Sequence, residues 1–336
     1  MNPKLAPNPA RRAGLTLTAL AALVMMCPTG RAQAQAWPAK PIRLVIGFAP
    51  GGAADYVART LSDPMGRALG QSVVVENKAG AGSSLAADFV AKAAPDGYTL
   101  LIASPSSISV NPALNPKLSY SAKDLVPVAR VTSSPLVVAV NPKVGIGSIQ
   151  ELIAAAKKAP GSLNYTTSGN GSAPHLGAAH FSRVAGVEMV HIPYKGGAPA
   201  IASVVAGDAQ LTFGTPPSVL PMVQSGRLKA LAVTSPNRSP LVPEIAGMNE
   251  AGLPGFSMSF WYGLFVPVGT PPDAVRAATA EAARELFEGH KYVFVMHEDQ
   301  GAPHVHLSVR ADRYDGVRLS PRKADLDRWR EVFARN

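Results

Sequence analysis

The chain has 336 residues, of which 47% are hydrophobic and 16% are charged, and its formal net charge is +10. The first 280 residues contain no cluster of arginine or lysine, which argues against nucleic-acid binding, and a mild basic excess suits an anionic ligand. The single cysteine, Cys27, excludes an internal disulfide.

Residues 1–36 have the pattern of a secretory signal peptide. A basic start with Lys4, Arg11 and Arg12 precedes an apolar run at 15–27, and small residues ending at Ala36 resemble a cleavage site. The apolar run is too short and too interrupted for a membrane span. Cleavage would remove four basic residues, lowering the formal charge from +10 to +6, together with Cys27. We expect a periplasmic protein of about 300 residues, long enough for two domains.

Alternating strand and helix patterns follow the signal segment. Apolar runs predict strands in both halves of the chain, and periodic segments between them predict helices. The expected strands are 42–47, 73–76, 98–103, 126–130, 136–140, 163–167, 188–192, 209–214 and 228–235, and the expected helices are 54–69, 84–93, 148–158, 173–185, 199–206 and 271–288. Strands separated by helices indicate parallel sheets, so we predict two α/β lobes with a cleft between them.

A glycine-rich turn joins the first strand to the first helix. It reads Phe48-Ala-Pro-Gly-Gly-Ala-Ala-Asp55, and its backbone N–H groups, at a helix start that Asp55 can cap, favour an anion such as a carboxylate. An ordinary turn that needs glycine only for its backbone angles is the alternative. In open parallel sheets, ligands bind beyond the carboxyl ends of the strands.

Three further loops of small polar residues follow predicted strands. They span 104–107, 167–172 and 194–197, and each offers hydroxyls and amides near a helix start. Lys195 could add positive charge, although a lysine beside a turn is more often only solvated. His175, His180 and His191 lack metal-ligand spacing, so we expect structural roles for them.

Five motifs together give a specific resemblance. They are the run 37–52 with Asp55, the run 75–78 with Gly80 and Gly82, Pro95-Asp-Gly-Tyr98, His191-Ile-Pro-Tyr-Lys-Gly196 and Trp261-Tyr-Gly-Leu-Phe265. In order and over residues 37–280, they resemble the Bug family, the extracytoplasmic receptors of tripartite tricarboxylate transporters.

This resemblance implies a type II periplasmic-binding-protein (Venus flytrap) α/β fold that closes on a small carboxylate. It also implies a receptor and not an enzyme, a monomer, and a membrane permease as partner. The implied divisions are lobe 1 at 37–140, lobe 2 at 141–255 and a return to lobe 1 at 256–280, with hinges near Asn141 and 255–260. The implied ligand-binding residues are Phe48, Ala49, Gly51, Gly52, Ala53, Asp55, Ser104, Ser106, Thr167, Ser168, Ser172, Tyr194 and Thr215.

The tail departs from this pattern. Four of the seven histidines fall within 289–306, and strand alternation would place His304 and His306 on one face with His297 beside them, a spacing that suits a divalent metal. Histidines scattered on a solvated strand are the alternative. From about residue 282 the tail resembles the third motif of plasmid mobilisation relaxases.

The relaxase resemblance covers too few residues for that domain's sheet. The preceding strands and the tyrosine nucleophile are missing, and from Glu281 onward ten basic residues balance ten acidic ones. We therefore expect no nickase activity and no nucleic-acid partner. The hypothesis is a gene fusion near 279–286 in which residues 281–336 replace the receptor's closing helices. We expect no cofactor, apart from a divalent metal at the three tail histidines as a candidate.

Overall fold

The computed structural model describes residues 37–275, 277, 290–297 and 304–313. Within them the chain forms two five-stranded sheets, each with helices packed against it, and a separate two-stranded hairpin. The described helices are all shorter or more polar than a membrane crossing requires. The segment expected to be a signal peptide lies outside the described residues.

The first sheet has the strand order β2-β1-β3-β10-β4. Its strands are β1 (Ile42–Ile46), β2 (Val73–Asn77), β3 (Thr99–Ala103), β4 (Leu125–Pro135) and β10 (Ser259–Pro267). β1 pairs in parallel with β2 and β3, whereas β10 runs antiparallel to β3 and β4. Helices α2 (Ala53–Leu69) and α3 (Ser84–Ala91) follow β1 and β2, and the short turns η1 (Ala81–Ser83), η2 (Ser106–Val110), α4 (Asn111–Leu114) and η3 (Ala122–Asp124) connect the remainder.

The second sheet has the order β7-β6-β8-β5-β9. Its strands are β5 (Val137–Val140), β6 (Asn164–Thr167), β7 (Val190–Pro193), β8 (Leu211–Gly214) and β9 (Lys229–Val233). The helices of this lobe are α5 (Ile149–Lys158), α6 (Ala173–Ala185), α7 (Gly197–Ala206) and α8 (Pro216–Gln224), and the turn η4 (Pro142–Val144) precedes α5.

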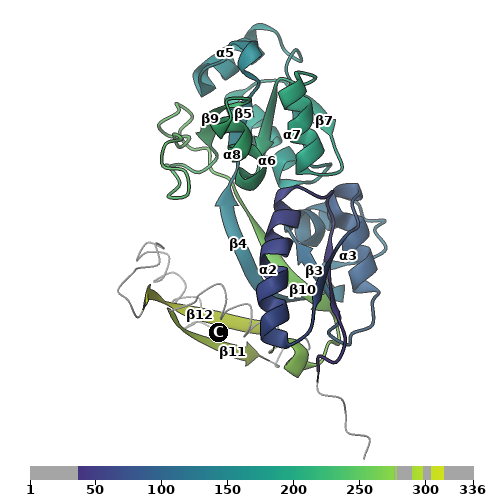
Figure 1. Cartoon of the computed structure of the whole chain (residues 1–336). Helices are drawn as coiled ribbons and strands as arrows, with labels where there is room; N and C mark the ends of the chain where they lie inside the picture. Colours follow the sequence, from purple (N-terminus) through teal and green to yellow (C-terminus); the bar gives the residue numbers. More distant parts are fainter. Residues whose placement is uncertain (1–36, 276, 278–289, 298–303, 314–336) are drawn as a thin grey trace, which may run out of the picture. The chain divides into compact units, whose positions relative to one another are not determined.

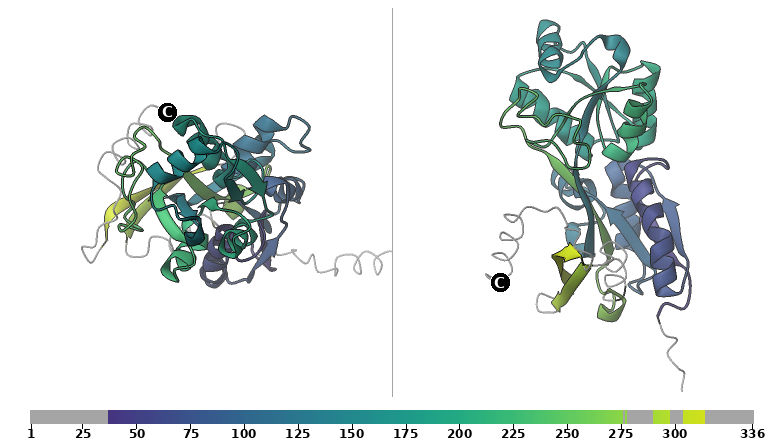
Figure 2. Two further views of the ribbon diagram at one scale, coloured as in Figure 1. Left: turned by 90° about the horizontal axis from the view of Figure 1, so that it is seen from above. Right: turned by 60° about the vertical axis from the view of Figure 1, so that its left-hand side comes forward.

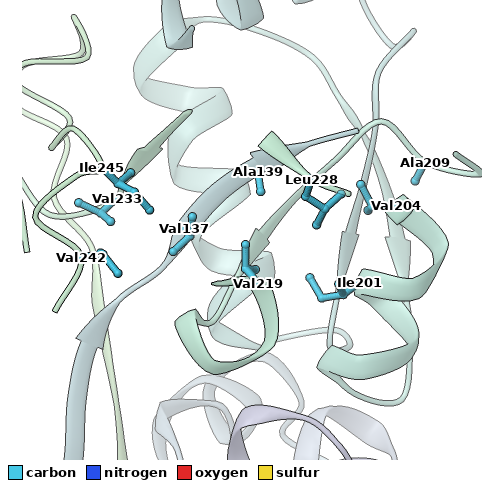
Figure 3. Close-up of a cluster of buried hydrophobic side chains, with 10 residues drawn as sticks. All are labelled: Val137, Ala139, Ile201, Val204, Ala209, Val219, Leu228, Val233, Val242 and Ile245. Atoms are coloured by element: carbon cyan, nitrogen blue, oxygen red, sulfur yellow. The ribbon is translucent and has the colours of Figure 1, made fainter. Parts of the chain in front are cut away.

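A cluster of buried aliphatic side chains holds α7 and α8 against this sheet. Val137 and Ala139 of β5 pack with Val204 of α7 and Val219 of α8, and all four side chains are fully buried (Figure 3). Each fully buried valine or leucine side chain contributes about 1.5–3 kcal/mol to the stability of the folded state. The cluster therefore fixes the positions at which α7 and α8 begin.

Two neighbouring strands carry the chain between the sheets. β4 and β10 pair along their whole length, and the views agree that they lie side by side where the chain leaves one sheet for the other (Figures 1 and 2). The chain first passes from one sheet to the other at Leu136, because β5 already belongs to the second sheet. The family resemblance implies a boundary at residue 140 instead, which would leave β5 in lobe 1. Both sheets are mixed and not wholly parallel, because β5 and β10 enter against the direction of their neighbours.

A β-hairpin is the last described element. β11 (His290–His297) pairs antiparallel with β12 (His304–Arg313), and His297 lies opposite His304 in the backbone register. The backbone register therefore places His297 beside His304, as the spacing of the tail histidines predicts. Most of the expected helix at 271–288 lies outside the described residues.

Candidate functional site

Four helices begin around one small cavity. Its lining residues include the starts of α2, α6, α7 and α8, together with the ends of β6 and β8. Partial positive charge gathers at a helix N-terminus because its first N–H groups have no partner within the helix. The lining residues are Phe48, Gly52, Ala53, Ala54, Thr167, Ser168, Pro174, Gly197, Ala200, Ile201, Thr212, Gly214, Thr215, Ser218 and Tyr262.

The cavity is suited to an anion, although its described lining carries no charged side chain. Among the described lining residues none is ionic at neutral pH, and burial raises the pKa of the Tyr262 phenol, which keeps it protonated and neutral. Each helix N-terminus stabilises a nearby anion by about 0.3–1 kcal/mol, and by more where the terminus is partly buried. The cavity volume is about 20 Å³, which is room for little more than one water molecule. A larger anion can therefore enter the cavity only while the lobes are apart.

Asp55 holds the turn that begins α2. The helix starts at Ala53 with Gly52 as its N-cap, so Asp55 lies within the first turn and is not the cap that the sequence suggested. Its buried carboxylate accepts hydrogen bonds from the Gly51 N–H (3.0 Å), the Asn77 amide (3.1 Å) and the Arg59 guanidinium (2.9 Å). Burial alone would raise the pKa of Asp55, but these three donors outweigh it and lower the pKa.

The two lobes meet through glycines beside the cavity. The Ala49 N–H of the first lobe donates to the Lys195 carbonyl of the second at 3.0 Å. A Cβ added to Gly196 would lie 2.8 Å from the Ala49 nitrogen, and one added to Gly52 would lie 3.5 Å from the Gly197 nitrogen. The starts of α2 and α7 can approach this closely only because side chains are missing there.

A second contact between the lobes involves a left-handed turn. Ala81, Gly82 and Ser83 have positive φ values of 47°, 58° and 79°. The Asn111 amide holds this turn by donating to the carbonyl of Gly82 at 2.9 Å and to the hydroxyl of Ser84 at 2.9 Å. A Cβ on Gly82 would lie 2.1 Å from the Asn170 carbonyl oxygen. Each residue with a Cβ in the left-handed conformation raises the conformational free energy of the folded chain by roughly 1–2 kcal/mol. The surrounding contacts must therefore stabilise the turn.

A larger cavity adjoins the first one. Its volume is about 360 Å³, and it shares Ser168 with the smaller cavity. Gly80, Ala81 and Gly82 line it from the first lobe, while Tyr194 and Lys195 line it from the second. It offers space for the part of a ligand that the small cavity cannot hold.

A comparison with known proteins identifies the family. The model of the tripartite tricarboxylate transporter family receptor, TctC, matches residues 57–309. The chain belongs to this receptor family. Protein BugT of Bordetella pertussis is 40% identical over 244 residues, which are 72% of this chain and 75% of BugT.

Solved structures agree with this assignment. Rpa4515 of Rhodopseudomonas palustris, solved with adipate, is 32% identical with a TM-score of 0.72, over 74% of this receptor and 83% of that chain. MatC of the same organism, solved with malate, is 32% identical with a TM-score of 0.71. This match covers 75% of this receptor and 86% of MatC. The fold is the Venus flytrap of periplasmic binding proteins, as expected, and the family consists of substrate receptors and not enzymes.

The receptor brings together six of the residues expected at the site. Phe48, Gly52, Ala53, Thr167, Ser168 and Thr215 line the small cavity. Tyr194 lines the larger cavity, and Ser172 caps α6 by accepting from the His175 N–H. Gly51 and Asp55 hold the α2 turn, and Ala49 makes the contact between the lobes.

Ser104 and Ser106 are buried and are not lining residues of either cavity. Their hydroxyls have no hydrogen-bond partner within the described part of the chain. Sequence reasoning included the 194–197 loop before α7, although it did not name Gly197 as a ligand-binding residue. It missed α8, which brings Ser218 to the cavity, and also Tyr262 on β10. The double proline at 216–217 is a helix-start signal that could have revealed α8.

The relaxase resemblance of the tail receives no support from these comparisons. The receptor family model runs through residue 309, past the junction expected near 279–286. The side chains of His297, His304 and His306 lie outside the described residues. Within the described residues, no group of three or more potential metal ligands is found.

Proposed function

We propose that this receptor binds a small carboxylate in the periplasm for a tripartite tricarboxylate transporter. The observation that carries the proposal is the convergence of four helix N-termini on one cavity whose described lining lacks charged side chains. N–H groups at the start of α2, at Ala53 and Ala54, and of α7, at Gly197, are suited to an anion's oxygens. The solved relatives with adipate and malate support a carboxylate ligand.

The two cavities suggest how such a ligand would lie. One carboxylate would occupy the small cavity between the starts of α2 and α7, and the remainder would extend past Ser168 into the larger cavity. Lys195 lines that larger cavity, where it could face a second carboxylate. Because the small cavity holds little more than a water molecule, binding would begin with the lobes apart and end with closure along β4 and β10.

Export and delivery complete the proposal. The secretory pattern of residues 1–36 supports cleavage before Gln35 or Trp37 and a periplasmic location. The family match supports a membrane permease as the recipient of the ligand. We propose that the receptor acts as a monomer, without a cofactor.

Thermal unfolding with a panel of ligands tests carboxylate binding. At 100 times the dissociation constant a ligand adds about 2.7 kcal/mol to the stability of its folded receptor, which raises Tm by several degrees. We expect malate or adipate to produce this rise and adipamide, which lacks the charge, to produce none.

The variant Gly52→Val provides the site control. Gly52 has an extended backbone, so valine fits its φ and ψ, but the side chain would enter the space before the Gly197 nitrogen. We expect the rise in Tm to disappear in this variant. Equal shifts with adipate and adipamide, or unchanged shifts in Gly52→Val, would contradict the proposed site.

A further inference from the structure

A histidine lies directly behind one hydroxyl of the small cavity. Thr167, at the end of β6, lines the cavity, and its Oγ1 is 2.6 Å from Nε2 of His191 on the neighbouring strand β7. The His191 ring stacks on the ring of Tyr165, with centroids 5.1 Å apart, and on the ring of His175, with centroids 4.1 Å apart. This packing fixes the imidazole against the hydroxyl.

The protonation of His191 decides what the Thr167 hydroxyl can do. The hydroxyl has one hydrogen, and Oγ1 already accepts from the Gly169 N–H at 3.2 Å. In the neutral tautomer that carries its hydrogen on Nδ1, Nε2 has no proton, so the hydroxyl donates to it and presents only lone pairs to the cavity. When Nε2 carries a proton, His191 donates instead, and the hydroxyl hydrogen turns either to the Gly169 carbonyl, at 3.4 Å, or to a ligand with a stronger acceptor. An anion is repelled in the first arrangement and bound in the second.

The surroundings keep His191 neutral in the absence of an anion. His175 of α6 and Tyr165 of β6 are the titratable groups whose rings pack against it among the described residues. Burial, with a smaller effect of a charge on His175, lowers the pKa of His191 to about 4. His175 accepts the Gly171 N–H at Nδ1 (3.1 Å), a bond that protonation of Nδ1 would break. His191 is therefore the member of the pair that can gain a proton without losing a backbone bond.

We propose that His191 positions the Thr167 hydroxyl as a donor to the bound carboxylate and takes up one proton from solvent when that carboxylate binds. The inference rests on the proposed function, since it needs an anion in the small cavity. The proton bonds to Nε2, the Thr167 hydrogen turns from Nε2 to the carboxylate, and no covalent bond between heavy atoms changes. His191 thus acts as a positioning residue through Thr167.

The direction of the pH dependence follows from linkage. An anion beside Thr167 raises the pKa of His191, so the complex holds a proton that the free receptor lacks, and affinity increases as pH falls from 8 to 6. The increase is at most tenfold per pH unit for one proton. Without ligand, stability falls as pH decreases from about 6.5 toward 4, because the unfolded chain binds a proton at His191 that the folded receptor does not.

Titration calorimetry of the full receptor with malate and with adipate, at pH 6, 7 and 8, tests the proposal. Each titration is repeated in two buffers of different ionisation enthalpy, which measures proton uptake directly. His191→Gln keeps an N–H donor near Thr167 but cannot titrate. His180→Gln is the matched control, because His180 lies on α6 but stacks on Phe256.

We expect wild type and His180→Gln to bind more tightly at pH 6 than at pH 8 with net proton uptake. His191→Gln should bind with an affinity that is independent of pH. Binding without proton uptake in wild type, or an unchanged pH slope in His191→Gln, would overturn the inference and leave the receptor function intact. If neither dicarboxylate binds wild type at any pH, the proposed ligand class fails and the inference fails with it.

Discussion

Replacing Gly196 with valine will weaken carboxylate binding by roughly 100-fold, or about 2.7 kcal/mol. The backbone of Gly196 is extended, with φ 165° and ψ 173°, so valine fits its own conformation. Its Cβ, however, would lie 2.8 Å from the Ala49 nitrogen, and the three nearest atoms all belong to Ala49 of the first lobe. The substitution therefore opposes closure and leaves each lobe free to fold.

Isothermal titration with malate or adipate measures this loss, and thermal unfolding without ligand measures folding. Gly147→Val is the matched control, because its Cβ would meet only the flexible ends of Lys229 and Glu151 within the second lobe. The control should bind like wild type. If Gly196→Val bound with full affinity and remained stable, the ligand would not require the contact at Ala49, and the closed arrangement would not be the binding form.

Replacing Asp55 with alanine will lower the free energy of unfolding by about 2–4 kcal/mol and will also weaken ligand binding. The Asp55 carboxylate accepts hydrogen bonds from the Gly51 N–H and the Asn77 amide next to the cavity. Each buried donor that loses its acceptor lowers the stability of the folded state by about 1–3 kcal/mol. Without Asp55 the turn that places the Ala53 and Ala54 amides loses its anchor.

Urea unfolding at neutral pH measures the stability loss, and Asp63→Ala is the control on the same helix. Asp63 is exposed, so its removal should change stability by less than about 0.5 kcal/mol. Because the pKa of Asp55 is lowered in the folded state, its contribution is present above the unfolded pKa and is lost as pH falls through the folded pKa. The difference between wild type and Asp55→Ala should shrink in acid. A constant difference down to low pH would show that the charge of Asp55 is not what stabilises the turn.

The sequence predicted most of the α/β elements because their patterns are local. The helix at 173–185 matches its observed bounds, and α2 begins one residue earlier than expected. Two features depended on tertiary structure. The apolar run at 136–140 looks the same in either lobe, so only strand pairing could assign β5 to the second sheet. Residues 261–265 were noted for a motif, but the place of β10 between β3 and β4 depends on pairing with strands more than 100 residues away.

The site was predicted in part for a similar reason. Glycine-rich and serine-rich loops were predicted after β1, β6 and β7, and these loops do line the two cavities, whereas the predicted 104–107 loop after β3 lines neither. His191 was expected to be structural because its spacing excludes a metal site. Its contact with Thr167 arises from the parallel register of β6 and β7, which sequence spacing does not reveal. The left-handed turn at 81–83 was equally hidden, because alanine and serine rarely adopt positive φ.

A crystal structure of the receptor with malate or adipate tests the central claim most directly. We predict one carboxylate between the starts of α2 and α7, with its oxygens within hydrogen-bond distance of the Ala53, Ala54 or Gly197 nitrogens and of the Thr167 hydroxyl. The lobes should remain joined through Ala49 and Lys195. A carboxylate bound only by exposed lysine or arginine side chains, outside this cavity, would contradict the account.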